Sequence, residues 1–261
     1  MSTIDRHSNF SDLSSAENTK ILSDPNASFT VYYWGMTSAG STARDLLAYG
    51  KASWKNVPIT FESWAAGTYK TPFRSIPTLA IRSEEGKEVT LAESIVVDQF
   101  LAKRFHLLGD NEWEEFQIKG FYSNIHYLRE RSFMNVTWTH ADKRKIALEK
   151  FLTKTLPSFI EDHEFHLKAN GGNGHYVGDK LTLADIHLAN VIYHFSHLPA
   201  GETITAIFKT SELLWKVKEE VEKNPKIAAW RQTEEWKQFD RYSVEVYSVT
   251  APPADEETKE E

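Results

Sequence analysis

An acid–serine pair, Glu93-Ser94, stands directly before an apolar run that is typical of a helix. Serine is a common helix N-cap, so the pair could simply begin the helix. The free N–H groups of a helix start, together with a serine hydroxyl, also favour an anion. Glu93 beside them would attract a cation, and an anion next to a cation describes the head group of an α-amino acid. The pair therefore predicts either a helix cap or an amino-acid-binding site.

A proline, Pro77, opens the strand pattern that precedes this pair. Proline lacks the N–H that a sheet ladder uses, so a strand start or a sheet edge explains its position. The alternative is a cis Ile76-Pro77 bond, which would expose the backbone N–H and C=O of Ile76. An extended peptide could pair with that backbone as an added strand. Together with Ser94, this alternative predicts a short peptide as the ligand.

Two histidine pairs, His163 with His166 and His194 with His197, have i,i+3 spacing. A metal site needs at least a third ligand in suitable geometry. We therefore expect surface or packing histidines and no metal. The glycine-rich stretch at 170–174 is not followed by Gly-Lys-Ser/Thr, so it predicts a turn and not a phosphate-binding loop.

The elements that must position these residues fall into two blocks. Residues 30–107 follow the order β-α-β-loop-β-β-α, with a hairpin that turns at Glu85-Gly86. From about Asp110 onward only helical periodicity is present, with a break at Asn224-Pro225. We expect a small α/β domain joined to a larger all-helical domain.

The expected boundaries follow from composition and pattern. Residues 1–28 are rich in Ser, Asn and Asp and predict a disordered or loosely packed arm. The α/β domain is expected over 29–107 and the all-helical domain over 113–242. Residues 243–261 contain an acidic, proline-containing stretch and predict a disordered tail.

Charge and composition exclude several classes of function. The net charge is −7, with 37 acidic against 30 basic residues, and no basic face for nucleic acid is apparent. No apolar run approaches the ~20 residues that span a bilayer, and the polar N-terminus has no secretory apolar region. We therefore expect a cytoplasmic protein without a membrane or nucleic-acid partner. The chain has no cysteine, so a ligand must supply any thiol.

Two motifs together resemble one known family. "SIPTL" followed by "TLAES" and an apolar helix resembles the thioredoxin-like half of the cytosolic glutathione S-transferase superfamily. "YVGDKLTLADIHL" resembles the matching motif of the helical half, where Thr182 and Asp185 fit a capping box. The likeness spans about residues 30–240. It implies a thioredoxin-like βαβ-ββα domain followed by an all-α helical bundle, with glutathione as the co-substrate.

Within this superfamily the chain looks most like the sigma-type, prostaglandin-D-synthase-like members. "YYWGMTSAGSTARDLLAYG" places Tyr33, Trp34 and Arg44 at the positions of their tyrosine, aromatic residue and helix arginine. The tryptophan that sigma-type members carry on the loop before the cis-proline aligns with Trp64. Three features differ. Where sigma-type members have an arginine-rich turn, this chain has "MTSAG". The lysine that they carry between the loop tryptophan and the proline is displaced to Lys70. The acid that they contribute from the partner subunit aligns near His126-Tyr127, where this chain has no carboxylate.

The resemblance implies how glutathione is held. Ser94 and the helix start would take the γ-glutamyl carboxylate, with Glu93 on the ammonium group. The Ile76 backbone would pair with the cysteinyl unit, and Trp64 and Lys70 would hold the glycyl carboxylate. The complete set implied for glutathione is Trp34, Trp64, Lys70, Ser75, Ile76, Pro77, Glu93 and Ser94.

The bound thiol must become a thiolate. A free thiol has a pKa of ~8.5, and lowering it by roughly two units requires about 2.7 kcal/mol. One hydrogen bond to a charged group supplies ~1.5–3 kcal/mol, so a single hydroxyl nearly suffices. Tyr33 is the first candidate. Thr37 or Ser38 is the alternative, because other classes place a catalytic serine just beyond this strand, and a Tyr33 that only packs the strand is the third possibility.

The electrophile is expected beside the thiol, against the helical half. "FYSNIHYLRERSFMNVTW" offers a pocket of aromatic and apolar residues: Tyr122, Tyr127, Phe133, Met134 and Trp138. Such a stripe at helical spacing is also typical of a core. The composition suits a flat hydrophobic co-substrate without naming one.

The function expected from the sequence is a glutathione transferase that adds the thiolate to hydrophobic electrophiles in detoxification or secondary metabolism, with peroxidase or isomerase side activity. One alternative is a non-catalytic binding or regulatory module of the same fold. Another is a maleylacetoacetate-type isomerase, which "TSAG" favours but which lacks the Ser-Ser-Cys turn of that class. The resemblance also implies a homodimer, the commonest oligomer.

Overall fold

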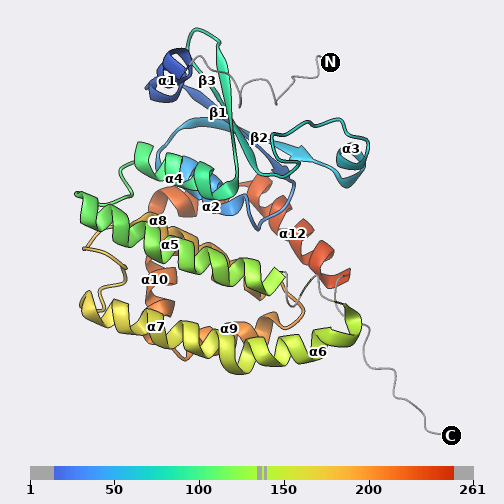
Figure 1. The fold of residues 1–261 in the computed structure, drawn as a ribbon, viewed down its shortest axis with the longest axis vertical. Coiled ribbons are helices and arrows are strands. Elements are labelled where there is room, and N and C mark those ends of the chain that lie inside the picture. Colours follow the sequence, from blue (N-terminus) through green and yellow to red (C-terminus); the bar gives the residue numbers. More distant parts are fainter. Residues whose placement is uncertain (1–14, 134–136, 138–139, 250–261) are drawn as a thin grey trace, which may run out of the picture.

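The computed structural model describes residues 15–133, 137 and 140–249. The first block is a four-stranded sheet with helices against it, in the upper part of Figure 1. Its elements are α1 (Ser15–Ser23), β1 (Ser28–Trp34), α2 (Ser41–Tyr49), β2 (Ser53–Ile59), α3 (Phe61–Ala65), β3 (Thr78–Arg82), β4 (Glu88–Ala92) and α4 (Ser94–Arg104). The predicted order of strands and helices is confirmed.

The sheet has the order β2-β1-β3-β4, with β1 parallel to β2 and antiparallel to β3. The alternating residues Phe29, Val31 and Tyr33 of β1 are buried. Tyr32 pairs with Thr78, the first residue of β3, so Tyr33 lies beside the point where Pro77 enters that strand. The register therefore brings the end of β1 next to the Ile76–Pro77 segment.

The second block is helical. Its elements are α5 (Glu112–Ser132), α6 (Ala141–Lys150), the π-helical stretch η2 (Phe151–Thr155), α7 (Leu156–Ala169), α8 (Leu183–Ser196), α9 (Gly201–Lys209), α10 (Glu212–Lys223), α11 (Pro225–Arg231) and α12 (Glu234–Val249). The thioredoxin-like domain followed by a helical bundle is thus the observed fold class.

Helix α8 forms the centre of the helical half, and nearly all of its side chains are buried. The predicted capping box is present: Asp185 accepts hydrogen bonds from the backbone N–H and the hydroxyl of Thr182 at 2.8 and 2.9 Å. The other carboxylate oxygen accepts the Tyr176 N–H at 2.9 Å. Asp185 therefore fixes both the start of α8 and the turn that leads into it.

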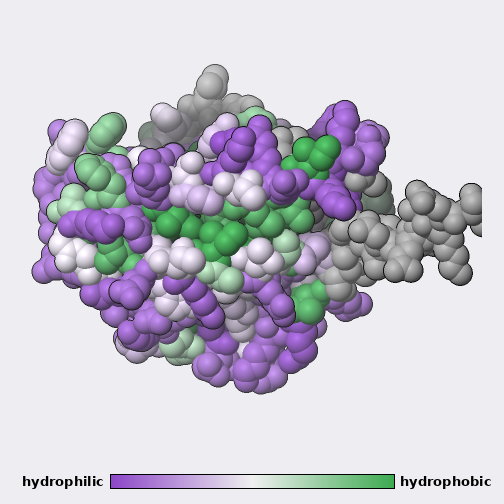
Figure 2. All heavy atoms as spheres, turned by 90° about the horizontal axis from the view of Figure 1, so that it is seen from below, coloured by the Kyte–Doolittle hydropathy of each residue, from purple (hydrophilic) through white to green (hydrophobic). Residues whose placement is uncertain are grey.

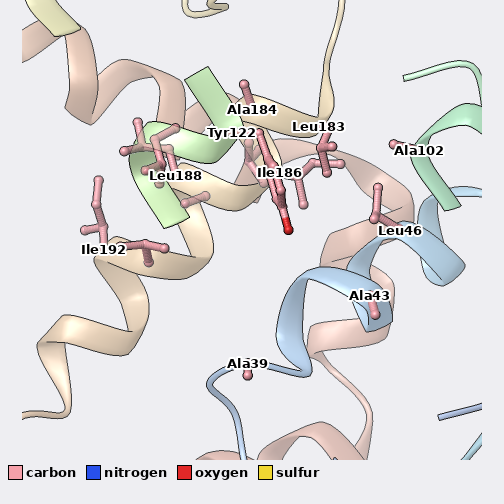
Figure 3. Close-up of a cluster of buried hydrophobic side chains, with 14 of the residues drawn as sticks. Ala39, Ala43, Leu46, Ala102, Tyr122, Leu183, Ala184, Ile186, Leu188 and Ile192 are labelled. Atoms are coloured by element: carbon pink, nitrogen blue, oxygen red, sulfur yellow. The ribbon is translucent and has the colours of Figure 1, made fainter. Parts of the chain in front are cut away.

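The two halves share one continuous core. Figure 3 shows Ala43 and Leu46 of α2 facing the region where Tyr122 of α5 meets Ile186 of α8. Polar contacts add to this packing: the carbonyl of Leu107 accepts the N–H of Leu183 at 3.0 Å. The halves are therefore joined by buried side chains and by backbone hydrogen bonding.

Two boundary predictions are wrong in part. Residues 15–23 are not a loose arm but form α1, because Ile21 is buried and Arg104 donates to the carbonyls of Leu22 and Asp24. Residues 243–249 are not a disordered tail but the last turns of α12, in which Ser243 and Tyr247 are buried. Residues 1–14 and 250–261 lie outside the described part of the chain.

The surface of the helical half is mixed. Seen from below, an elongated apolar band crosses this face and is surrounded by hydrophilic residues (Figure 2). Among the described residues, no helix combines the length and the apolar composition that crossing a bilayer requires.

Candidate active site

A pocket of about 460 Å³ lies where the start of α4 faces the middle of α5. Its lining combines both halves of the molecule: Ala39, Ile76, Glu93, Ser94, Ile95, Ser123, His126, Tyr127, Arg129 and Glu130. Four of the residues singled out in the sequence, Ile76, Glu93, Ser94 and Tyr127, are therefore brought together here.

The start of α4 forms one wall of this pocket. Glu93 is the N-cap residue, with φ at +69°, and its side chain accepts none of the first N–H groups of the helix. Its carboxylate instead accepts the hydroxyl of Ser75 at 3.0 Å. The Thr71 hydroxyl in turn accepts the N–H of Ser75 at 3.1 Å. The backbone of this wall is therefore free for an anion, while Glu93 is held beside it as an acceptor for a cation.

The Ile76–Pro77 bond is cis. Ile76 is half-buried and lines the pocket, and Pro77 is buried at the start of β3. Ile76, the residue that the sequence singled out for peptide pairing, thus lines the same pocket as the Glu93-Ser94 pair.

Tyr33 lies at the end of β1, and only 5% of it is exposed. Its phenolic oxygen accepts the N–H of Ala39, a pocket residue, at 3.2 Å. Gly40 packs on its ring so closely that a Cβ there would lie 2.7 Å from Cδ1. Because the phenol accepts this bond, its own proton remains available to a second acceptor.

Thr37 and Ser38, the alternative hydroxyls, are engaged by α12. The Ser243 hydroxyl accepts the Thr37 N–H at 2.8 Å and lies 2.7 Å from the Thr37 hydroxyl. Since Ser243 donates to the carbonyl of Phe239, Thr37 is the donor between the two hydroxyls. Ser38 hydrogen bonds to Tyr247, whose pKa is raised by burial and by the nearby Tyr33.

Arg44 holds the base of the β1–α2 loop. Its guanidinium donates to the carbonyls of Met36 and Trp34 at 2.5 and 3.1 Å and to Asn56 at 2.8 Å. Complete burial lowers the pKa of Arg44 to about 10, which still leaves it charged at neutral pH. The arginine that matched the sigma-type pattern is therefore a loop anchor in this molecule.

Five of the eight residues implied for glutathione lie outside the pocket lining: Trp34, Trp64, Lys70, Ser75 and Pro77. Trp34 contacts Trp64 edge to face at 5.8 Å and stacks on Phe61 at 4.6 Å. Lys70 is exposed on the loop after α3. The tryptophans form an aromatic group at the end of β1, next to the β1–α2 loop.

The expected aromatic pocket is corrected by the structure. Tyr122 is fully buried, donates to Asp98 at 2.9 Å and packs on His187 at 4.5 Å, so it belongs to the core. Phe133 is half-buried and stacks on His194. Tyr127 is 60% exposed and does line the pocket. Met134 and Trp138 lie outside the described residues.

The paired histidines have partners within the protein. His163 lies 2.6 Å from the Tyr176 hydroxyl and 3.0 Å from Asn124, and His197 lies 2.9 Å from Asp240. His166 meets the ring of Phe121 edge to face. Over the residues that the structure describes, no three metal-ligating side chains gather into a site.

Several residues that shape the site were not among the candidate site residues predicted from the sequence. His126, Arg129 and Glu130 form the α5 wall, and Ser243 and Tyr247 reach the β1–α2 loop from α12. The i, i+3 and i+4 spacing of the α5 set indicates a shared helix face. The α12 residues had no such signal, because nothing local shows that this helix packs on the loop.

The chain and its fold are similar to those of known proteins. Residues 126–234 match the family described as "Glutathione S-transferase, C-terminal domain". The molecule has the glutathione transferase fold. A sigma class glutathione transferase of Fasciola hepatica superposes with a TM-score of 0.69 at 18% identity, covering 78% of this chain and 95% of that one. The predicted resemblance to this superfamily is confirmed.

Other relatives agree with this assignment. "Structure of prostaglandin synthase D of Nilaparvata lugens" superposes with a TM-score of 0.69 at 22% identity, covering 79% of this chain and 98% of that one. In sequence, "Probable glutathione S-transferase 7" of Caenorhabditis elegans is 28% identical over 78% of this chain and 96% of its own length. "Glutathione S-transferase S1" of Drosophila melanogaster is 29% identical over 66% of each protein.

Proposed function

We propose that this glutathione-transferase-fold protein is itself a glutathione transferase, which activates the glutathione thiol and adds it to electrophiles in detoxification or secondary metabolism. One observation carries the proposal: the same pocket is lined by the uncapped start of α4, by Glu93 and by Ile76, which precedes the cis-proline. These are the groups that an extended peptide with an amino-acid head requires.

In this proposal Ser94 and the start of α4 bind the γ-glutamyl carboxylate, and Glu93 binds the ammonium group. The Ser75 hydroxyl holds Glu93 in place. Ile76 pairs with the cysteinyl unit, which directs the sulfur toward the β1–α2 loop. The glycyl carboxylate extends toward Trp64 and Lys70.

We propose Tyr33 as the hydroxyl that stabilises the thiolate. The hydrogen bond that it accepts from Ala39 N–H polarises the phenol, which makes its proton a better donor. Thr37 already donates to Ser243, and Ser38 is bonded to Tyr247, so both alternatives have other partners. These contacts favour Tyr33.

The test is Tyr33→Phe, assayed by conjugation of glutathione to an aryl halide across pH. Removing a hydrogen bond to a charged group costs about 1.5–3 kcal/mol, so kcat/KM should fall roughly 10- to 100-fold. The pKa of the bound thiol in the pH–rate profile should rise. Thr37→Ala and Ser38→Ala serve as matched hydroxyl deletions. If Tyr33→Phe keeps full turnover while Thr37→Ala or Ser38→Ala loses it, the hydroxyl of that loop residue, and not Tyr33, stabilises the thiolate.

Retention on immobilised glutathione separates catalysis from binding alone. Binding with conjugation supports the transferase. Binding without turnover toward several electrophiles would indicate a non-catalytic module, which the deep burial of Tyr33 would then explain. Absence of both would contradict the ligand assignment itself.

We also propose a homodimer that acts in the cytoplasm. A groove of about 630 Å³ between α5 and α7 is lined by Phe116, Phe121 and Phe165, two of which are largely exposed. A self-complementary contact over such a surface is the usual basis of a twofold dimer. Sedimentation should give a species of twice the 29.9 kDa chain mass. The cytoplasm is the compartment where the glutathione pool keeps thiols reduced.

A further inference from the structure

Arg129 lines the same pocket, opposite the start of α4, although only 7% of it is exposed. Its guanidinium lies against Phe133, 5.7 Å from the ring centroid, and its Nη2 contacts the Glu130 carboxylate at 3.1 Å. The guanidinium of arginine remains protonated in proteins. The α5 wall of the pocket therefore carries a fixed positive charge.

This charge is only partly balanced by its surroundings. Glu130 is half-exposed, and an ion pair with an exposed partner contributes little. Burial, together with the nearby Arg129, lowers the pKa of His126 to about 4, so His126 is neutral at pH 7. Burial raises the pKa of Asp98 to about 7, which leaves that carboxyl only partly ionised. The α5 wall therefore offers one buried guanidinium whose neighbouring carboxylate, Glu130, is itself half-exposed.

The hydrogen-bonding capacity of this wall is also unused. Within the described part of the chain, Arg129 Nε and His126 Nδ1 are buried and have no hydrogen-bond partner. Nε of arginine is only ever a donor, and an unpartnered buried donor costs about 1–3 kcal/mol. Both residues line the pocket, where a bound acceptor group would satisfy the Nε–H of Arg129.

We propose that the electrophilic co-substrate carries an anionic group, a carboxylate, that pairs with Arg129 on the α5 wall. The inference rests on the proposed transferase function and names the substrate class of that site. Glutathione has its own positions for its two carboxylates, at the start of α4 and toward Lys70. The apolar body of the co-substrate would lie against Ile95 and the exposed ring of Tyr127.

A matched pair of electrophiles tests this. 2-Chloro-1,3-dinitrobenzene is neutral, and 4-chloro-3,5-dinitrobenzoate adds one carboxylate to the same ring, para to the chlorine. In both, the thiolate forms a C–S bond at the chlorine-bearing carbon, chloride leaves, and the thiol proton passes to solvent. The kcat/KM for each electrophile is divided by the rate constant of its uncatalysed reaction with glutathione. The readout is this normalised value for the benzoate divided by the normalised value for the neutral compound. A charge-assisted hydrogen bond predicts a ratio of about ten or more.

The variants separate a pairing role from a structural one. Arg129→Gln should bring the ratio to near one, and Arg129→Lys should keep part of it. Lys119→Gln removes the same charge from α5 at its ion pair with Glu115 and should leave the ratio unchanged. Glu130→Gln removes the competing carboxylate and should raise the ratio by about two- to fivefold. Because Glu130 lies at the surface, this variant tests the proposal even if Arg129→Gln does not fold.

Three outcomes would overturn the inference. One is a wild-type ratio near one despite turnover of the neutral substrate. Another is an Arg129→Gln variant that changes the KM for glutathione and leaves the ratio intact, which would assign Arg129 to the peptide. The third is a Glu130→Gln ratio that falls or stays constant. Loss of turnover with both electrophiles in the wild type is a different result, which would contradict the transferase function itself.

Discussion

At the residue scale, Asp98 of α4 is a buried acid whose folding energetics depend on pH. One carboxylate oxygen accepts the Tyr122 hydroxyl at 2.9 Å, and the other has no partner among the described residues. Burial raises its pKa to about 7, against the opposing effects of Tyr122 and Arg129. Because the pKa of Asp98 is higher in the folded than in the unfolded state, the folded state keeps its proton to higher pH. The contribution of Asp98 to the free energy of unfolding is therefore lost as pH rises from about 4 to 7.

Asp98→Asn removes this titration while its amide oxygen still accepts the Tyr122 hydroxyl. The free energy of unfolding of the variant minus that of the wild type should therefore increase with pH, by about 1.4 kcal/mol per unit between pH 4 and 7. Urea unfolding at unit intervals of pH measures this difference. Asp142→Asn, an exposed acid on α6, controls for loss of a surface charge. A difference that stays constant with pH would contradict the assignment.

At the element scale, α12 secures the loop that carries the catalytic candidates. Ser243 accepts the N–H and the hydroxyl of Thr37, and Phe239 packs on the Arg44 guanidinium at 4.4 Å from the ring centroid.

Ser243→Ala would leave the buried Thr37 N–H unpaired, which costs about 1–3 kcal/mol. We expect a lower midpoint in thermal unfolding and a reduced kcat, because Ala39 and Tyr33 depend on the same loop. Val244→Ala, an exposed neighbour, should change neither quantity, and equal effects of both variants would refute the role of Ser243.

At the scale of the whole molecule, a buried ion pair joins the two halves. Asp45 of α2 accepts from Arg231 of α11 at 2.6 Å and from Asn190 of α8 at 2.9 Å. Asp45→Asn removes the closer counterion of the buried Arg231 and leaves only the Glu222 carboxylate, 3.6 Å away. Breaking a buried pair in this way costs about 3–5 kcal/mol. Urea unfolding should show this loss, and the double variant Asp45→Asn/Arg231→Met should recover part of it. A double variant as unstable as the sum of the single variants would show that the charges are not coupled.

Local patterns in the sequence were sufficient to predict most of the elements and the fold class. Hydrophobic period, turn residues and caps are local properties, so the strand order, the capping box at Thr182 and the Glu93-Ser94 start of α4 could all be predicted. The same patterns failed where burial depends on a distant partner. Tyr122 matched an aromatic pocket in sequence, but Asp98 and α8 take it into the core.

Which side chains face the pocket depends on the packing of segments that are distant in the sequence. The charged wall of Arg129, His126 and Glu130 becomes visible once α5 lies opposite the start of α4. Residues 243–249, which composition assigned to a tail, become part of α12 because Ser243 and Tyr247 find buried partners on the β1–α2 loop. Contacts between segments some 200 positions apart leave no periodic trace along the chain, and they exist only after the two halves have packed together.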